Sequence, residues 1–248
     1  MKPELLHAQV CCLTYIPNAN YELIGYKLVT SVSTFEDNAV ILSNDDSICI
    51  AIRGSDDLQD WIDNLEASSV SIPKVGRIHE GFADSFFGCK SKTKYRVKWL
   101  WKCIPYIKRY KRDSFDGLFQ VLDKEFVKVY SNNKKLIITG HSKGGALAEL
   151  LALKYSQLGY KLDLYTYGCP KVGFESYKNT FESYNINYLR FVNERDIVPD
   201  LPPFGKFVHV VKPIRIGSSG IAIFLMQGVF EHTPSRYISA LQRIYGDA

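Results

Sequence analysis

The sequence predicts an α/β fold in which helices cover both faces of a mainly parallel central sheet. The first observation is that runs rich in β-forming residues recur along the chain. The second is that longer intervals between them carry apolar residues at helical spacing. Strands that alternate with helices in this way form parallel sheets. The β-forming runs span 26–33, 37–43, 47–54, 134–141, 161–168, 186–193 and 207–216.

Two helices are predicted between the later runs. In residues 114–130 the apolar side chains fall on one helical face. That face carries Phe115, Leu118, Phe119, Leu122, Phe126 and Val129. The second helix follows Ser142 and is stopped by Gly159, a glycine at the C-terminal end of the helix. An amphipathic helix is also expected at the N-terminus, and another after His232.

The chain is expected to form a single domain over residues 1–248. It carries no internal repeat and no long linker rich in Pro, Gly or Ser. With 46% hydrophobic and 23% charged residues, the composition is that of a globular protein with a buried core, which argues against disorder. Within this domain, a basic insertion is predicted at about residues 89–113.

The sequence gives three indications of compartment and cofactors. The longest uncharged stretch, 216–230, is too short to span a bilayer, and the N-terminus lacks a secretory signal pattern. Six cysteines show no C-x-x-C pair and no zinc-ligand spacing, so free thiols are expected. We therefore expect a cytoplasmic protein, with peripheral membrane contact as an option, and no metal or organic cofactor. Nothing in the sequence indicates an oligomeric state.

Residues 90–112 hold ten lysines and arginines and no acid. The whole chain carries a net charge of +5, so the basicity is a local patch. Trp99 and Trp101 lie among the cations. This combination suits an anionic membrane surface, and nucleic acid is a less favoured partner of the same charge. A solvated insertion without a partner is the third interpretation.

The stretch Gly140-His141-Ser142-Lys143-Gly144 fits the pattern G-x-S-x-G, with a predicted strand before it and a helix after it. In this setting the serine is a nucleophile at a sharp turn. The backbone N–H of Lys143 then points at a developing oxyanion. His141 is expected to pack within the turn itself.

A nucleophilic serine needs a base, and the base needs an orienting acid; in this fold they follow in the order Ser, Asp, His. Asp196 directly follows a predicted strand, whereas Asp163 lies at a strand start facing solvent and Asp200 is a weaker alternative. His232 lies on a loop before a helix and is favoured as the base. His209 lies inside a predicted strand and is the alternative.

Six blocks of the sequence resemble the class 3 lipases, a fungal-lipase-like branch of the α/β-hydrolases. In order, the blocks are "AIRGSDDLQDWIDNL", "IHEGFADSF", "ITGHSKGGALAELLAL", "YTYGCPKVG", "RFVNERDIVPDLPP" and "HTPSRY", over roughly residues 48–240. The resemblance implies an α/β-hydrolase fold and a catalytic triad of Ser142, Asp196 and His232. It also implies that the backbone N–H groups of Ser55 and Lys143 form the oxyanion hole.

The resemblance further implies an esterase or lipase that hydrolyses carboxylic esters of acylglycerols through an acyl-enzyme. Phospholipase A1 or monoacylglycerol lipase activity is the alternative within this chemistry, and an acyltransferase would use the same intermediate. A catalytically silent lipid-binding protein of the same fold is the alternative outside it. The substrate in every case is a lipid ester.

An amphipathic helix is predicted directly after Ser55. Its apolar positions follow the spacing i, i+3, i+4, i+7. They are Leu58, Trp61, Ile62 and Leu65. Periodicity alone favours a surface helix that faces the core, whereas the resemblance implies a lid over the site.

The side chain of Lys143 departs from the family, in which leucine is commoner at this position. Either its aliphatic stem packs beside the turn and the ammonium extends into solvent, or the charge faces the site and favours anionic substrates.

Overall fold

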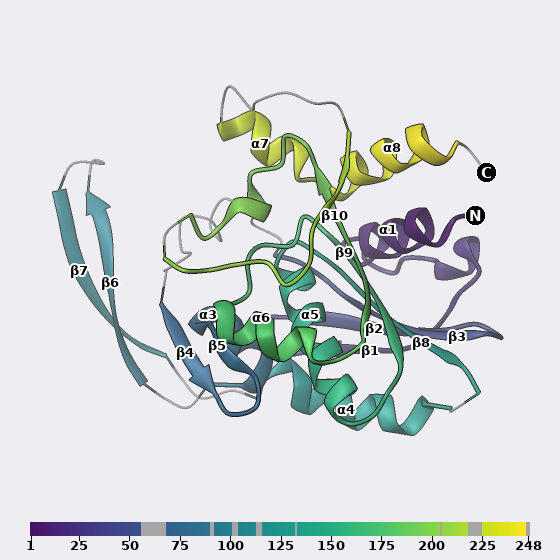
Figure 1. Cartoon of the computed structure of the whole chain (residues 1–248), viewed down its shortest axis with the longest axis horizontal. Coiled ribbons are helices and arrows are strands. Elements are labelled where there is room, and N and C mark those ends of the chain that lie inside the picture. The colour runs from purple at the N-terminus through teal and green to yellow at the C-terminus, as the bar shows by residue number, and fades with distance from the viewer. Residues whose placement is uncertain are drawn as a thin grey trace.

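A seven-stranded sheet forms the centre of the protein (Figure 1). This computed structural model describes residues 1–55, 68–89, 92–100, 104–112, 116–131, 133–203, 205–217 and 225–246, with the backbone alone at 92–100, 104–112 and 225–227. The strand order is β1-β2-β3-β8-β9-β10-β11. The strands are β1 (Lys27–Ser33), β2 (Asn38–Ser43), β3 (Ser47–Ile52), β8 (Lys135–His141), β9 (Leu162–Tyr167), β10 (Asn187–Asn193) and β11 (Ile214–Ile216).

The sheet is mainly parallel. β1, β2 and β3 pair antiparallel, and every pairing from β3 through β8, β9 and β10 to β11 is parallel. The parallel strands are the ones that alternate with helices in the sequence, as the predicted fold class requires. That fold class is confirmed.

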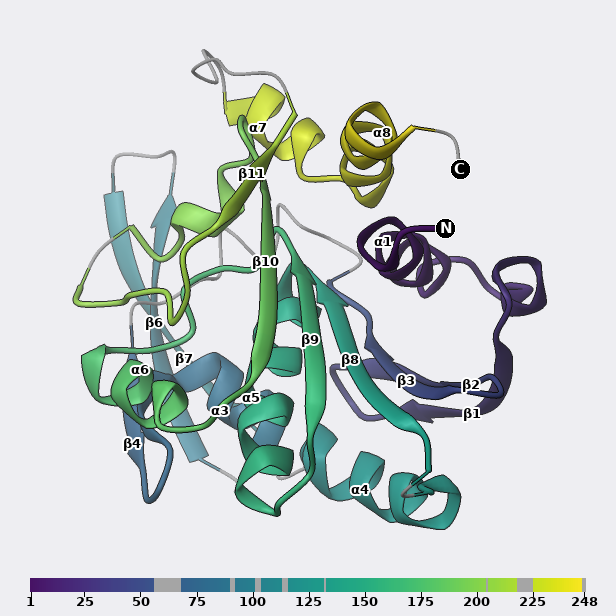
Figure 2. The ribbon, with the colours of Figure 1, turned by 45° about the vertical axis from the view of Figure 1, so that its right-hand side comes forward.

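Helices lie on both faces of the sheet (Figure 2). On one face α1 (Pro3–Leu13) packs against α8 (Pro234–Tyr245), although they come from opposite ends of the chain. On the other face α5 (Lys143–Gln157) crosses β8 and β9, with α3 (Glu80–Phe87) and α4 (Leu118–Val129) beside it. The remaining helices are α6 (Glu175–Glu182), α7 (Leu225–Glu231) and the short turns η1 (Tyr21–Ile24) and η2 (Val198–Asp200).

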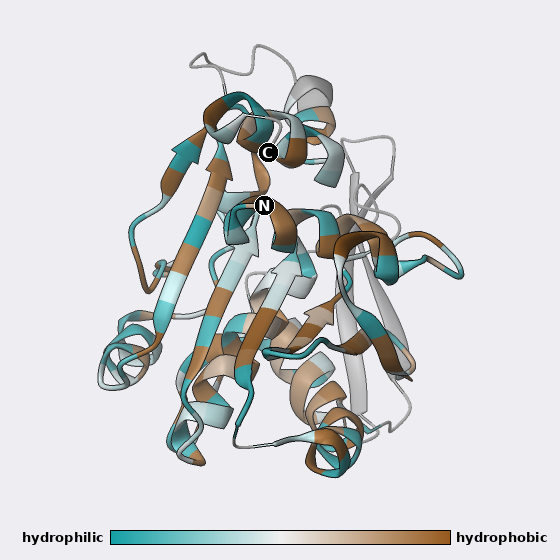
Figure 3. Ribbon diagram, turned by 90° about the vertical axis from the view of Figure 1, so that its right-hand side faces the viewer, coloured by the Kyte–Doolittle hydropathy of each residue, from teal (hydrophilic) through white to brown (hydrophobic). Residues whose placement is uncertain are grey.

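Each face of the sheet has its own hydrophobic core. The larger cluster lies under α3, α4 and α5 and includes Leu122, Phe126 and Tyr155. The second lies under α1 and α8 and includes Leu5 and Leu241. Figure 3 shows both hydrophobic and hydrophilic residues on α1 and α8, as expected for helices with one buried face. Both faces of the sheet are therefore buried, and its polar groups are available for chemistry mainly at the strand ends.

The predicted strand at 207–216 is wrong over most of its length, because only Ile214–Ile216 joins the sheet. Val208 instead makes an isolated antiparallel bridge with Gly173. Pro213 lacks an N–H for a ladder, which limits the strand to the residues after it. A small hairpin of β4 (Ser69–Ile72) and β5 (Gly76–His79) was not predicted.

The basic insertion contains a second unpredicted hairpin, formed by β6 (Lys92–Leu100) and β7 (Ile104–Arg112). Its strands form a two-stranded sheet separate from the central one, and Figure 1 shows them extending away from it. Directly paired residues share a face of a hairpin, and so do alternate residues of one strand. By this register one face holds the positions of six cations, namely Lys92, Lys94, Arg96, Lys98, Lys108 and Arg112.

Two further expectations concern free thiols and the lack of a segment that could span a bilayer. Cys11, Cys12, Cys49, Cys89 and Cys169 are free thiols. Across the described ranges, none of the helices has the length and apolar character needed to cross a membrane.

Candidate active site

Ser142 lies at a sharp turn between β8 and α5. Its backbone φ of 59° and ψ of −132° place a non-glycine residue in a strained region. The flanking glycines permit the turn: a Cβ on Gly140 would lie 2.3 Å from the Gly144 carbonyl oxygen, and one on Gly144 would lie 2.2 Å from that of Ile52. The sequence pattern therefore folds locally into a nucleophile elbow.

The backbone N–H groups of Ser142 and Lys143 have different surroundings. The Ser142 N–H donates to the carbonyl of Tyr167 at the end of β9, at 2.9 Å. Lys143 is the first residue of α5, so its N–H has no acceptor within its own helix. That N–H belongs to the residue after Ser142, which is the position of an oxyanion donor in a nucleophile elbow.

Asp196 and His232 form a buried pair on two loops that meet at the carboxyl ends of the strands. Asp196 follows β10, and His232 follows α7; their side chains are 0% and 2% exposed. His232 Nδ1 lies 2.6 Å from Asp196 Oδ2. With its Nδ1 proton donated to the carboxylate, a neutral His232 carries its lone pair on Nε2.

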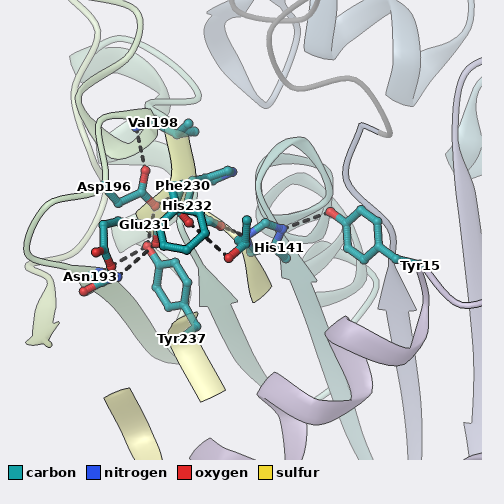
Figure 4. Close-up of polar contacts among 10 residues, drawn as sticks. Tyr15, His141, Asn193, Asp196, Val198, Phe230, Glu231, His232 and Tyr237 are labelled. Carbon is teal, nitrogen blue, oxygen red and sulfur yellow. Dashed lines mark hydrogen bonds and ion pairs between the residues drawn. The ribbon is translucent and has the colours of Figure 1, made fainter. Parts of the chain in front are cut away.

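Three donors orient the Asp196 carboxylate (Figure 4). Oδ2 accepts from His232 Nδ1 and from the Tyr237 hydroxyl, each at 2.6 Å, and Oδ1 accepts from the Val198 N–H at 2.8 Å. Burial and the neighbouring Asp196 raise the pKa of Tyr237 well above its usual value, so its hydroxyl remains a donor. Three hydrogen bonds thus hold the Asp196 carboxylate in one orientation.

The pair lies next to the serine turn. Gly168 follows Tyr167 and has a φ of +62°, and a Cβ there would lie 2.6 Å from His232 Cε1 and 2.8 Å from Asp196 Oδ2. Ser142 Oγ and His232 Nε2 are both buried, and neither has a hydrogen-bond partner in the part of the chain that the structure describes. These are the two atoms that a proton transfer from a candidate nucleophile to a candidate base would join.

A chain of hydrogen bonds runs behind the serine turn from Gly54 to His232. His141 Nε2 lies 2.6 Å from the His232 carbonyl oxygen, which can only accept, so Nε2 carries the proton. Burial lowers the pKa of His141 well below its usual value, which leaves Nδ1 as an acceptor. The Tyr15 hydroxyl donates to it at 2.9 Å and accepts from the Gly54 N–H at 3.0 Å.

This chain connects the two sides of the site. Figure 4 shows Tyr15 on one side of His141 and the Asp196–His232 pair on the other. Gly54 itself touches the turn, since a Cβ there would lie 2.9 Å from Ser142 Cβ. Ser55 is the next residue and is half-buried. The loop that carries the predicted second oxyanion donor is thus held against Ser142 through Tyr15.

The Lys143 side chain adopts an arrangement that the sequence did not suggest. Its ammonium lies 2.7 Å from Asp37 Oδ1, and the two side chains are 11% and 1% exposed. Extension of the ammonium into solvent is therefore wrong. The charge that the other interpretation directs at the substrate is neutralised by a buried carboxylate.

The alternative acids and base lie in other surroundings. His209 Nε2 lies 2.7 Å from the Pro199 carbonyl oxygen, and burial together with Arg190 lowers the pKa of His209 to about 3. Asp163 is 8% exposed and forms an ion pair with Lys135, so its expected solvent-facing position is wrong. Asp200 is exposed.

The predicted lid residues Leu58, Trp61, Ile62 and Leu65 lie outside the described residues. Within the described ranges, no group of three or more His, Cys, Asp and Glu side chains is arranged to hold a metal ion.

Comparison with known proteins assigns the family. The family model described as "Lipase (class 3)" matches residues 49–206. The chain belongs to the class 3 lipase family. The resemblance to the class 3 lipases is thereby confirmed, and five of the six sequence blocks lie within the matched residues.

Two relatives show how far the similarity extends. This member of the class 3 lipase family is 34% identical over 223 residues to a lipase from Rhizomucor miehei. The matched region covers 82% of the chain and 54% of the relative. A solved structure described as a triacylglycerol lipase with a serine protease triad at its catalytic centre is 31% identical. It has a TM-score of 0.59 and covers 90% of this chain and 79% of that one.

A third relative corrects the expected location. It is 27% identical, comes from Fusarium solani, and is named a secreted mono- and diacylglycerol lipase; the match covers 63% of the chain and 39% of the relative. The cytoplasmic location expected for this class 3 lipase family member is therefore wrong. The chain spans about half or less of the length of these two curated relatives.

Sequence reasoning missed Tyr15, Asn193 and Tyr237, which support the site from outside the motifs. Asn193 holds the loop before His232, since its Nδ2 donates to the Glu231 carbonyl at 2.9 Å. Tyr237 ends the block "HTPSRY", so its position beside His232 was a signal that could have found it. Tyr15 had no such signal, because 126 positions separate it from His141.

Proposed function

We propose that the chain is a serine hydrolase that cleaves carboxylic esters of acylglycerols. The observation that carries the proposal is the pairing of an oriented histidine with a serine elbow. His232 donates through Nδ1 to Asp196, while its Nε2 and Ser142 Oγ are buried without other partners in the described chain. Family membership and the lipase names of the relatives support the same chemistry.

In the proposed reaction Ser142 Oγ attacks the ester carbonyl carbon and gives its proton to His232 Nε2. The carbonyl π electrons move to oxygen, and the N–H groups of Lys143 and Ser55 stabilise that oxyanion. Nε2 then protonates the leaving alcohol, and an acyl-enzyme remains. Water attacks the acyl carbon by the same steps, releases the fatty acid and restores Ser142. Asp196 orients the ring and stabilises the imidazolium.

A serine-directed fluorophosphonate tests the nucleophile. We expect covalent labelling of the native chain and none of Ser142→Ala. Ser85→Ala is the matched control, because Ser85 is also buried but bonds to Glu36, and it should label normally. Labelling that persists in Ser142→Ala would assign the nucleophile elsewhere, and a native chain that does not label would favour the catalytically silent lipid-binding alternative.

Product analysis on tri-, di- and monoacylglycerols and on phospholipids then defines the substrate. Release of fatty acid from acylglycerols supports the proposal as stated. Release from phospholipids alone would favour the phospholipase A1 alternative.

We also propose that the β6–β7 hairpin contacts an anionic membrane surface. The register gathers six cationic positions on one face, whereas Arg109 and Lys111 belong to the other. A basic residue near an anionic bilayer contributes about 1 kcal/mol of binding free energy, so a face of this composition would hold the enzyme at its lipid substrate.

A further inference from the structure

A cavity of about 180 Å³ lies next to the Asp196–His232 pair. Its walls come from the ends of β10 and β11, the end of α7 and the exposed side of α8. The lining residues are Asn193, Arg195, Gly217, Glu231, Arg236 and Arg243. Four sequence segments thus converge on one polar cavity that the proposed hydrolysis does not use.

The charge of this cavity is cationic. Three arginines line it together with a single carboxylate, that of Glu231. Glu231 Oε2 accepts from Asn193 Nδ2 at 3.1 Å and makes no ion pair with the arginines. No described carboxylate lies within ion-pair distance of Arg195, Arg236 or Arg243. The cavity therefore concentrates positive charge that the described chain does not compensate.

The guanidinium groups keep donors available. Arg195 Nε is buried and has no hydrogen-bond partner in the described chain. Arg236 lies over the Phe230 ring, with its Cζ 4.2 Å from the ring centre, and that contact occupies its face and leaves its N–H edge. Arg243 donates only through Nε, to the Ser239 carbonyl oxygen at 3.2 Å, among the described residues. A buried donor without an acceptor is costly, which favours a ligand that supplies one.

We propose that this cavity is a binding site for a phosphate group. A guanidinium presents parallel N–H donors that match the oxygens of phosphate, and a site with several such forks binds it with defined geometry. Arg236 and Arg243 are seven residues apart on α8, so both lie on one helical face. Arg195 faces them from the loop after β10. The proposal does not depend on the hydrolytic activity, because phosphate binding is measured directly.

The site adjoins the candidate triad through covalent and hydrogen-bonded neighbours. Arg195 precedes Asp196, and Glu231 precedes His232. The Asn193 N–H donates to the Tyr237 hydroxyl at 3.1 Å, and that hydroxyl donates to Asp196. Figure 4 shows Asn193 and Glu231 together on the side of the pair that faces away from Tyr15. A phosphate at this position binds behind the pair rather than at the serine.

Calorimetric titration of the full chain with inorganic phosphate tests the site. We expect saturable binding at millimolar phosphate, weakened at least tenfold in Arg195→Gln and in Arg236→Gln. Arg77→Gln is the matched control, because Arg77 lies over the Phe174 ring much as Arg236 lies over Phe230 but on the β4–β5 hairpin. Its phosphate affinity should equal that of the native chain.

Glu231→Gln supplies a test of opposite sign. Glutamine keeps an oxygen for Asn193 and removes the one negative charge of the lining, so phosphate should bind several-fold more tightly. A variant that had merely lost its fold would not gain affinity. Affinities that are the same in the native chain, Arg195→Gln, Arg236→Gln and Glu231→Gln, or the absence of saturable binding, would overturn the proposal.

The source of the phosphate group is separated by two further probes. Glycerol phosphate in solution competes with inorganic phosphate if the ligand is soluble. Vesicles that contain phosphatidic acid bind in an Arg195- and Arg236-dependent manner if the group is a lipid headgroup. Either dependence on these arginines supports the site, and vesicle and glycerol phosphate binding that ignore both substitutions contradict it.

Discussion

Lys143 Nζ lies 2.7 Å from Asp37 Oδ1, and this ion pair fastens the first turn of α5 to the turn between β1 and β2. A cation in the first turn of a helix opposes the helix dipole. The buried carboxylate of Asp37 offsets that repulsion. The pair therefore accounts for a lysine at a position where the family usually has leucine.

A double-mutant cycle on this pair should show strong coupling. Asp37→Asn or Lys143→Met alone leaves one buried charge without its partner, which costs about 3 kcal/mol of unfolding free energy. The double variant should lose clearly less than the sum of the two. Urea denaturation measures all three. Lys128→Met is the control, because the Lys128–Glu125 pair is 63% and 34% exposed and should contribute under about 0.5 kcal/mol. Losses that simply add would show that the two charges do not interact.

The same ion pair predicts that Lys143 does not select the charge of the substrate. Lys143→Met keeps the backbone N–H that we assign to the oxyanion hole and removes a charge that Asp37 already compensates. The ratio of hydrolysis rates on neutral and anionic esters should therefore stay within about twofold of the native ratio. Rates measured below the unfolding temperature of the variant decide this. A fall in the hydrolysis rate on anionic esters alone would show that the Lys143 ammonium contacts the substrate.

Tyr15→Phe should lower kcat with little change in KM. Loss of the hydroxyl leaves the Gly54 N–H and His141 Nδ1 without the partner that joins them. We expect kcat to fall roughly tenfold, which is about 1.4 kcal/mol of transition-state stabilisation.

Tyr26→Phe is the matched control for Tyr15→Phe. It also removes a buried hydroxyl, which bonds to Ser47 at 3.2 Å, but under α1 and away from the serine turn. An equal fall in kcat for both variants, in proportion to lost thermal stability, would reduce Tyr15 to a structural residue.

How far the sequence predicts this fold depends on the range of the interactions. The central strands were located to within a few residues, because each is a short continuous run of β-forming residues that is buried over almost its whole length. The β6–β7 hairpin was missed because alternating lysines are not typical of a strand with a buried face. The segment 207–216 was overassigned because Val208 pairs with Gly173 rather than with the sheet.

The range of the interactions also decides which parts of the candidate site can be predicted from the sequence. The Ser142 elbow is local, and its glycines and flanking elements can be recognised from a few residues. The Asp37 partner of Lys143 and the Tyr15 partner of His141 lie far away in sequence. Nothing in either neighbourhood marks them, since a tyrosine after a helix or an aspartate in a turn is common. Such contacts become visible only when the chain is folded.

Glu149 should make the stability of the protein depend on pH near neutrality. It is 1% exposed within α5, and burial raises its pKa from 4.5 to about 7, against the opposing effects of the Tyr188 and Tyr177 hydroxyls and Arg190. The folded state then holds a proton that the unfolded state releases. The contribution of this bound proton to the free energy of unfolding is fully present below pH 4.5 and is lost as pH rises through about 7.

Glu149→Gln should remove this dependence, because glutamine cannot ionise. The difference in unfolding free energy between the native chain and the variant should shift by about 3 kcal/mol across that window. The native chain becomes less stable relative to the variant as pH rises. Taking the difference cancels His7 and His209, whose lowered pKa values of about 4 and about 3 act equally in both proteins. A difference that stays flat from pH 4.5 to 7.5 would show an ordinary carboxyl.

The two faces of the β6–β7 hairpin should differ in their effect on membrane binding. Lys94 and Lys98 are two of the six cationic positions on one face, whereas Arg109 and Lys111 occupy the other. The double variants Lys94→Gln/Lys98→Gln and Arg109→Gln/Lys111→Gln each remove two charges, so their net charges are equal. If one face lies on the bilayer, the first should weaken binding to anionic vesicles by about 2 kcal/mol, roughly thirtyfold, and the second much less.

Co-sedimentation with neutral and anionic vesicles at two salt concentrations measures this difference between the hairpin faces. Native binding should require anionic lipid and weaken with salt, because screening acts on exposed charges. The matched net charge makes the comparison decisive, since attraction that depends only on total charge would affect both double variants alike. Equal losses would therefore reject a docked face and leave a diffuse cationic patch. Binding that ignores both anionic lipid and salt would reject the membrane contact altogether.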